Sequence, residues 1–269
     1  MQGLTDEKGV KDMAVVLFDD GVHKCVAFTD LVAGEGVQAN QFAISHQGEG
    51  VLLDPGGNLT YKHLLAEISD YFLPSKTRYI FASHPDPDII ASVNGWLLIT
   101  DAQVLIAQEW ERFLPHFCLK GATVGRLKTI PPQGMCLDLN GGELQIIPAH
   151  FLHPVGNFHI YDPISKILFS GDVGASLVDA EEASQTVSDF NHHLHNNGML
   201  GFHQRYMSGN KACRYWVNMV RQLDIEWIVP QHGASFKGKE MVNQFLDWFE
   251  GLACGIDLLS QDDFQLLRK

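Results

Sequence analysis

Four short apolar segments in this sequence end just before side chains that can bind a metal. Each segment has the length and composition of a buried β-strand, which favours an α/β fold with its site at the strand ends. Ligand-type residues after four separate strands are much harder to ascribe to chance than those after one. The segments and the residues that follow them are Tyr79–Ala82 with His84, Leu144–Ile147 with His150 and His153, Ile167–Phe169 with Asp172, and Trp227–Val229 with His232.

The first of these strand ends carries three potential ligands at alternate positions, His84, Asp86 and Asp88. Pro85 and Pro87 stiffen the spacing and oppose a helix through it. An apolar pattern typical of a helix follows at once, so Asp88 stands where an N-cap carboxylate would. A proline-rich surface turn is the alternative interpretation, because short patterns of this kind also arise by chance.

Composition narrows the class of protein. The 269 residues are 45% hydrophobic, and the net charge of −13 disfavours nucleic acid or an anionic membrane as the main partner. No apolar stretch approaches the length of a membrane span, and residues 1–12 are expected to be a polar leader without a signal peptide. Five scattered cysteines without a CxxC pair predict reduced thiols in a cytoplasmic protein.

Hydrophobic periodicity and turn residues predict one α/β domain over residues 13–269, a sandwich of two sheets with helices outside. The long amphipathic patterns predict helices over 59–72, 89–99, 108–117, 203–223 and 238–253. The strands are expected at 13–18, 23–28, 40–45, 49–53, 79–82, 103–107, 143–147, 157–161, 166–169 and 226–229.

Two metal ions that share one carboxylate need about three ligands each, and the strand ends supply three imidazoles and three carboxylates. Oxygen-rich ligation without thiolates suits iron or manganese better than zinc. The sequence resembles the di-iron module of flavodiiron proteins, which have the metallo-β-lactamase αββα fold. Its spacing from His153 through Asp172 to His232 matches that family and favours His153 over His150. Two further segments resemble the family, Gly36–Phe42 and Phe202–Met207.

The resemblance implies a ligand set and also shows three departures. Asp86 stands where the family has Glu, Ile89 stands where it has a histidine, and no flavodoxin-like domain follows residue 269, so no flavin is expected. Ile89 is expected to leave the second iron with an open position beside an apolar wall. The implied ligands are His84, Asp86 and His153 for one iron, Asp88 and His232 for the other, and Asp172 as the bridge.

The departures favour a sensor over an enzyme. The chain resembles the oxygen-binding di-iron proteins of bacterial chemotaxis, which implies an O2 sensor with a stabilised diferric-peroxo adduct and chemotaxis proteins as partners. The alternatives are an O2 or NO reductase supplied by rubredoxin- or flavodoxin-like donors, and a zinc-dependent hydrolase. The flavodiiron resemblance also implies a homodimer.

The positions of the remaining histidines in the sequence indicate different roles. His150 and His116 are expected to border the ligand pocket, and His159 is expected to be structural. His203 is expected to pack or to hydrogen-bond near the site. The segment with His192, His193 and His195 is expected to be either a lid over the site or a solvated polar loop. The aromatic patch of Tyr206, Tyr215 and Trp216 is expected in the core.

Overall fold

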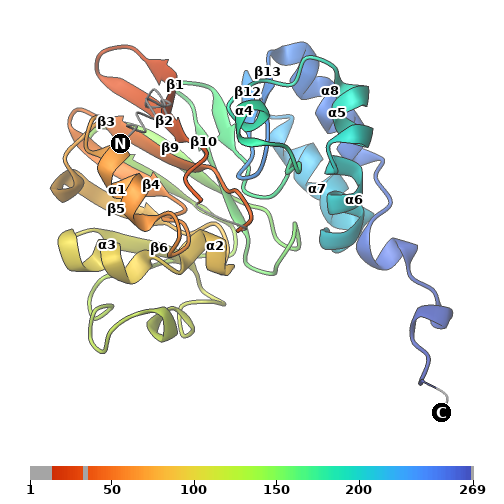
Figure 1. Cartoon of the computed structure of the whole chain (residues 1–269), viewed down its shortest axis with the longest axis horizontal. Coiled ribbons are helices and arrows are strands. Elements are labelled where there is room, and N and C mark those ends of the chain that lie inside the picture. The colour runs from red at the N-terminus through yellow and green to blue at the C-terminus, as the bar shows by residue number, and fades with distance from the viewer. Residues whose placement is uncertain (1–13, 33–35, 268–269) are drawn as a thin grey trace, which may run out of the picture.

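The computed structural model describes residues 14–32 and 36–267, so the expected leader lies outside the described residues. Two β-sheets face each other, and helices cover the outer face of each (Figure 1). The expected sandwich of two sheets between helices is confirmed. No helix in the described ranges combines the length and the apolar character needed to cross a membrane.

The first sheet has the strand order β1-β2-β3-β4-β5-β6-β7. Its first four strands pair antiparallel, and β4 to β7 pair parallel, so β4, β5 and β6 all run toward one edge. The strands are β1 Ala14–Asp19, β2 His23–Phe28, β3 Gln41–His46, β4 Glu49–Leu53, β5 Thr77–Phe81, β6 Gln103–Ala107 and β7 Leu127–Ile130.

The second sheet has the order β13-β12-β11-β10-β9-β8. Strands β11 and β12 pair parallel, although they are far apart in the chain, and this pairing brings their C-terminal ends side by side. The strands are β8 Met135–Leu139, β9 Gly142–Pro148, β10 Phe158–Asp162, β11 Ile167–Phe169, β12 Trp227–Val229 and β13 Phe236–Lys237.

Three apolar clusters hold the layers together. One lies between the sheets and contains Phe42, Phe81 and Phe158, all at most 2% exposed. The other two pack the helices onto the outer faces, with α1 and α3 on the first sheet and α6 to α8 on the second. The helices are α1 Tyr61–Ile68, α2 Pro87–Ile90, α3 Val93–Ile99, α4 Ala180–Ala183, α5 Phe190–Asn196, α6 Met199–Tyr206, α7 Asn210–Val220 and α8 Lys239–Glu250.

Three helix predictions were wrong. Residues 108–117 form turns and a short 3₁₀ helix at Leu114–Phe117. The expected helix 203–223 is two helices, because the chain between α6 and α7 turns away and the Ser208 amide donates to Phe151 O. Residues 89–99 split between α2 and α3. Strands β7, β8 and β13 and helices α4 and α5 were not expected.

Candidate metal centre

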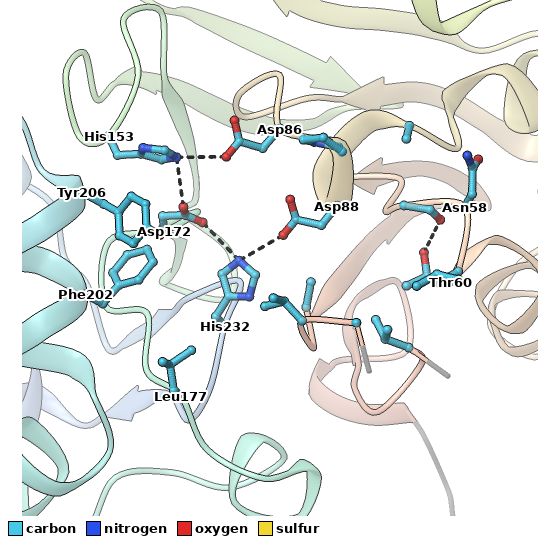
Figure 2. Close-up of a pocket in the computed structure, with 18 residues that line it drawn as sticks. Asn58, Thr60, Asp86, Asp88, His153, Asp172, Leu177, Phe202, Tyr206 and His232 are labelled. Carbon is cyan, nitrogen blue, oxygen red and sulfur yellow. Dashed lines mark hydrogen bonds and ion pairs between the residues drawn. The ribbon is translucent and has the colours of Figure 1, made fainter. Parts of the chain in front are cut away.

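The six predicted ligands come together at the edge where the strand ends of both sheets meet. His84 follows β5, His153 lies in the loop between β9 and β10, Asp172 follows β11 and His232 follows β12. Figure 2 shows Asp86, Asp88, His153, Asp172 and His232 pointing toward one another. The strand ends singled out in the sequence therefore do converge on a single site.

Asp172 lies at the middle of this cluster, because its two carboxylate oxygens face two different groups of ligands. Asp172 Oδ2 is 3.7 Å from His84 Nε2 and 3.5 Å from His153 Nε2. Asp172 Oδ1 is 3.5 Å from His232 Nε2. The Oδ1 atom is buried and has no hydrogen-bond partner among the described residues.

Asp86 and Asp88 complete the two groups. Asp86 Oδ2 lies 3.1 Å from His153 Nε2 and 3.7 Å from His84 Nε2, whereas Asp88 Oδ2 lies 3.5 Å from His232 Nε2. The N-cap of α2 is Asp86 and not Asp88, which corrects the expectation from the sequence. The Asp86 side chain makes no capping hydrogen bond, so its carboxylate is available to the site.

Hydrogen bonds orient two of the imidazoles. His232 Nδ1 lies 2.7 Å from Gln38 O, and a carbonyl only accepts, so Nδ1 carries a proton and Nε2 is the nitrogen that faces the cluster as a potential ligand. His84 Nδ1 lies 2.9 Å from Ser83 Oγ. Behind Ser83, the Asp54 carboxylate accepts the Ser83 amide, and burial raises the pKa of Asp54 to about 7. The sequence interpretation gave Gln38, Ser83 and Asp54 no role at the site.

The carboxylates create a negative site. Burial acts to lower the pKa of His153, but the hydrogen bond to Asp86 and the charge of Asp172 outweigh it, so that pKa is raised. His84 is more deeply buried, and burial lowers its pKa despite the same carboxylates. Such a site attracts a cation, and imidazole with carboxylate is a ligand set that suits iron.

The donor spacing fits metal ions. Two donors bound to one ion at about 2.0–2.2 Å lie roughly 3 Å or more apart. The distances within the cluster, from 3.1 to 3.7 Å, match this spacing, and most are too long for good hydrogen bonds. With the partnerless Asp172 Oδ1, this geometry fits two ions that share Asp172.

A cavity of 530 Å³ opens onto the cluster and is mostly apolar. Phe202 and Tyr206 from α6 line it together with Leu177, as Figure 2 shows. Tyr206 is 46% exposed and its ring contacts His153, so the expectation that Tyr206 lies in the core was wrong. The helical periodicity of α6 could not reveal this, because one helix face borders the cavity. The other apolar lining residues are Val32, Val37, Ala39, Leu59 and Ala91.

The three residues expected to border the ligand pocket are not in this lining. Ile89 is fully buried, and its effect on an open iron position stays a prediction. His150 points elsewhere: its Nε2 donates to Pro132 O at 2.7 Å, and the residue borders a separate cavity. His116 is exposed on the 3₁₀ helix Leu114–Phe117.

The other histidines also have definite places. His159 is buried and its Nδ1 accepts the Trp216 indole, as expected of a structural residue, and Trp216 is itself buried. Tyr215, by contrast, is 63% exposed and was wrongly expected in the core. His192, His193 and His195 lie in helix α5, so the expectation of a loop was wrong, and none of the three lines the cavity at the metal centre.

His203 is buried and held in its neutral form. Its Nδ1 donates to Met199 O at 2.7 Å, its Nε2 accepts the Gly174 amide at 2.9 Å, and burial lowers its pKa to about 4. Gly174 lies on the loop that carries Asp172. The expected hydrogen bond near the site is therefore confirmed.

Replacing His203 with Leu should have a pH-dependent cost in the metal-free protein. At pH 7.5 the variant should lose about 1–3 kcal/mol of unfolding free energy, because the buried Gly174 amide loses its acceptor. Below pH 6.5, the pKa of His203 in the unfolded chain, the unfolded wild type binds a proton at His203 that the native protein does not bind. The unfolding free energy of the wild type therefore decreases as the pH is lowered. The deficit in unfolding free energy of the variant relative to the wild type should therefore be smaller by roughly 2 kcal/mol at pH 5 than at pH 7.5. Urea titrations at both pH values measure it.

The exposed substitution His63→Leu is the control for this experiment. It removes a histidine without removing a buried hydrogen bond, so its unfolding free energy should follow that of the wild type at both pH values. A His203→Leu deficit that is equal at pH 7.5 and pH 5 would contradict the buried neutral state of His203.

Comparison with known proteins identifies the fold and the family of this chain. A family model described as ODP family beta lactamase matches residues 37–233. A structure described as the peroxy di-iron species of the chemotaxis sensor ODP is 40% identical, with a TM-score of 0.81, over 94% of this chain and 99% of that one. The apo state of the chemotaxis sensor ODP from T. denticola is also 40% identical, with a TM-score of 0.82, over 94% and 98%.

More distant relatives include one with a similar structure and one with a similar sequence. A flavo di-iron protein from Thermotoga maritima is 19% identical with a TM-score of 0.72, over 88% of this chain and 60% of that one. An uncharacterised protein of Methanocaldococcus jannaschii is 24% identical over 79% of this chain. The chain spans about half the length of this curated relative, 53%. The expected metallo-β-lactamase fold and the resemblance to flavodiiron modules are both confirmed.

Proposed function

The chain belongs to the ODP beta-lactamase family, and from this premise we propose that it binds dioxygen at a di-iron centre and serves as an oxygen sensor in bacterial chemotaxis. The observation that carries the proposal is the position of Asp172, whose two oxygens face two separate groups of ligands. The 40% identity to chemotaxis sensors over nearly the whole chain supports the same function.

The ligands are assigned in two groups. His84, Asp86 and His153 would hold one iron, Asp88 and His232 would hold the other, and Asp172 would join them. The donor distances of 3.1 to 3.7 Å and the thiolate-free ligand set support this assignment. Two ferrous ions held by these residues would supply the two electrons that dioxygen takes up on binding.

The residues around the proposed site would control the access of dioxygen to the metals and the lifetime of the bound state. Leu177, Phe202 and Tyr206 give the cavity an apolar wall that suits a small apolar gas. Gln38 and Ser83 hold two imidazoles in place, so the ligands need little rearrangement on binding. An apolar wall also keeps water and protons away from the metals, which favours retention of oxygen over its reduction.

The output of the sensor would be read by a chemotaxis signalling protein in the cytoplasm. The basis for this proposal is the description of two relatives as chemotaxis sensors. A long-lived oxygen-bound state is the property that such a partner needs, because a signal must outlast the binding event.

An optical experiment tests the proposed function. The protein is loaded with ferrous iron without oxygen, dioxygen is added without reductant, and the visible spectrum is followed. We expect an absorption band that persists for many minutes. A band that vanishes at once, with rapid oxygen consumption once a rubredoxin-like donor is present, would instead identify a reductase.

Two controls complete that experiment. Zinc-loaded protein has no electrons to give and should show no band. Failure of the protein to take up iron at all would overturn the di-iron assignment and favour a zinc-dependent hydrolase.

A further inference from the structure

Two buried cysteines meet where α7 lies beside the end of α8. Cys213 is on α7 and Cys254 follows α8, 41 positions later in the chain. Both side chains are fully buried, and their Sγ atoms lie 3.7 Å apart. The equally buried Cys25 hydrogen-bonds to Asp162 instead. Cys213 and Cys254 are therefore placed to react with each other.

The two sulfurs are close enough to bond after a small movement. A disulfide has an S–S length of about 2.0 Å, so each sulfur needs to move by only about 0.8 Å from the present separation of 3.7 Å. Small rotations of the two side chains can supply a shift of this size without moving α7 away from α8.

Hydrogen bonds hold the two segments that carry the cysteines. Asn210, in the first turn of α7, donates its side-chain amide to Glu250 O at 2.9 Å and to Leu252 O at 2.8 Å. The Asp257 carboxylate accepts the Asn210 backbone amide at 2.6 Å and the Cys254 amide at 3.2 Å. The chain on both sides of Cys254 is thus fastened to α7, which keeps the two sulfurs facing each other.

The contact between the thiols also makes them unequal. The hydrogen bond between them lowers the pKa of Cys254 and raises that of Cys213, although burial and the Asp257 charge act against the change at Cys254. The thiolate is the nucleophilic form of cysteine. Cys254 is therefore the thiol that reacts first, and Cys213 is the one that can resolve the product.

A small oxidant has a way to approach the pair. A cavity of 610 Å³ is lined by Ala212, which precedes Cys213, and by Ile256, which lies two residues after Cys254. Because the sulfurs themselves are fully buried, a molecule the size of water fits this approach better than a bulky disulfide such as oxidised glutathione. Hydrogen peroxide has the required size.

We propose that Cys213 and Cys254 are a peroxide-sensitive thiol pair that closes to a disulfide within one chain and locks α7 to the segment after α8. The pair is reduced at rest, as expected of cytoplasmic thiols. This modification site is separate from the metal ligands, goes beyond oxygen binding and does not require bound iron.

The reaction has two balanced steps. The Cys254 thiolate attacks one oxygen of hydrogen peroxide, the O–O bond breaks, and the leaving hydroxide takes up the thiol proton as water, which leaves a sulfenic acid. The Cys213 sulfur then attacks the Cys254 sulfur, the S–O bond breaks, and a second water leaves with the Cys213 proton. The two thiols lose two electrons and two protons, and peroxide is reduced to two waters.

Ser208 joins the pair to the metal centre. The Ile256 amide, two residues after Cys254, donates to Ser208 O at 3.0 Å, and Ser208 Oγ donates to His153 O at 3.4 Å. The segment that the disulfide would lock and the loop that carries a proposed iron ligand therefore share one residue. Oxidation of the pair has a direct route to the loop of His153.

Mass spectrometry on the full chain tests the proposal. The wild type is treated with hydrogen peroxide beside a chelator, so that no iron produces radicals, and is then unfolded in the presence of an alkylating agent. We expect two of its five cysteines to escape alkylation. Digestion should yield one cross-linked species that contains Cys213 and Cys254 and is two hydrogen atoms lighter than the two thiol peptides. A reductant should restore both thiols.

Three variants locate the link. Cys213→Ser and Cys254→Ser, made separately, each remove one sulfur of the pair and should form no cross-link. Cys136→Ser removes an exposed thiol and should form the cross-link as the wild type does. Circular dichroism checks the fold of each variant, and the wild-type result stands even if one of the buried variants fails to fold.

Thermal unfolding tests whether the link locks the native structure. The oxidised wild type should melt roughly 5–15 °C above the reduced wild type in the same chelator, because the disulfide closes a long loop in the unfolded chain. Cys213→Ser should show no such rise. A wild type that keeps both thiols, that forms sulfinic acid without a link, or that melts unchanged once linked would overturn the proposal, whatever the oxygen experiment shows.

Discussion

The substitution Asp172→Asn is expected to release most of the bound iron. Asp172 is 4% exposed and faces ligands with both oxygens, His84 and His153 with Oδ2 and His232 with Oδ1. Asparagine has no negative charge, and its amide nitrogen cannot ligate. The loss of affinity should exceed about 100-fold, the upper end for residues that only orient a ligand. Iron per chain, measured by mass spectrometry after anaerobic loading, tests this.

An aspartate away from the cluster serves as the control. Asp138 is exposed on β8, where its carboxylate accepts the Gly141 amide. Asp138→Asn also removes a carboxylate, but it should leave the iron content near that of the wild type. Near-normal iron in Asp172→Asn would remove the bridging assignment.

Removing the metal should lower the melting temperature by roughly 5–15 °C. Without a cation, the carboxylates of Asp86, Asp88 and Asp172 converge with little to offset their repulsion. A ligand bound only by the native state, at 100 to 1,000 times its dissociation constant, adds about 3–4 kcal/mol to the unfolding free energy. For a chain of this size each kcal/mol shifts the melting temperature by about 2–4 °C. Calorimetry of iron-loaded and chelator-treated protein measures the difference.

The Asp172→Asn variant is the control for that measurement as well. It holds little iron, so the chelator should leave its melting temperature nearly unchanged. Equal melting temperatures for loaded and chelator-treated wild type would show that the cluster does not bind metal in the folded protein.

Local sequence predicted which side chains gather at this site, because each one follows its strand within a few residues. Tyr79–Ala82 is apolar and buried, and His84 comes two residues later, where the chain leaves the sheet. The same relation holds for Asp172 after β11 and His232 after β12. Parallel strands end at the same edge of a sheet, so the strand pattern alone placed these side chains together.

Contacts between distant segments could not be predicted in this way. The helix expected over 203–223 breaks because Ser208 bonds to Phe151, and no local periodicity encodes that contact. Tyr206 has the same apolar pattern as a core residue, but the cavity beside His153 leaves it exposed. His150 follows β9 just as His153 does, yet only His153 reaches the cluster.

The sequence by itself determined which residues can bind metal and at which edge of the sheets they lie, because strand burial and the ligand that follows it are neighbours in the chain. Only the tertiary structure decided how they are used. Asp172 faces two sets of histidines, and Gln38 sets the tautomer of His232. Each of these depends on packing between segments that the chain separates, often by more than a hundred residues, and such packing leaves no periodic trace in sequence.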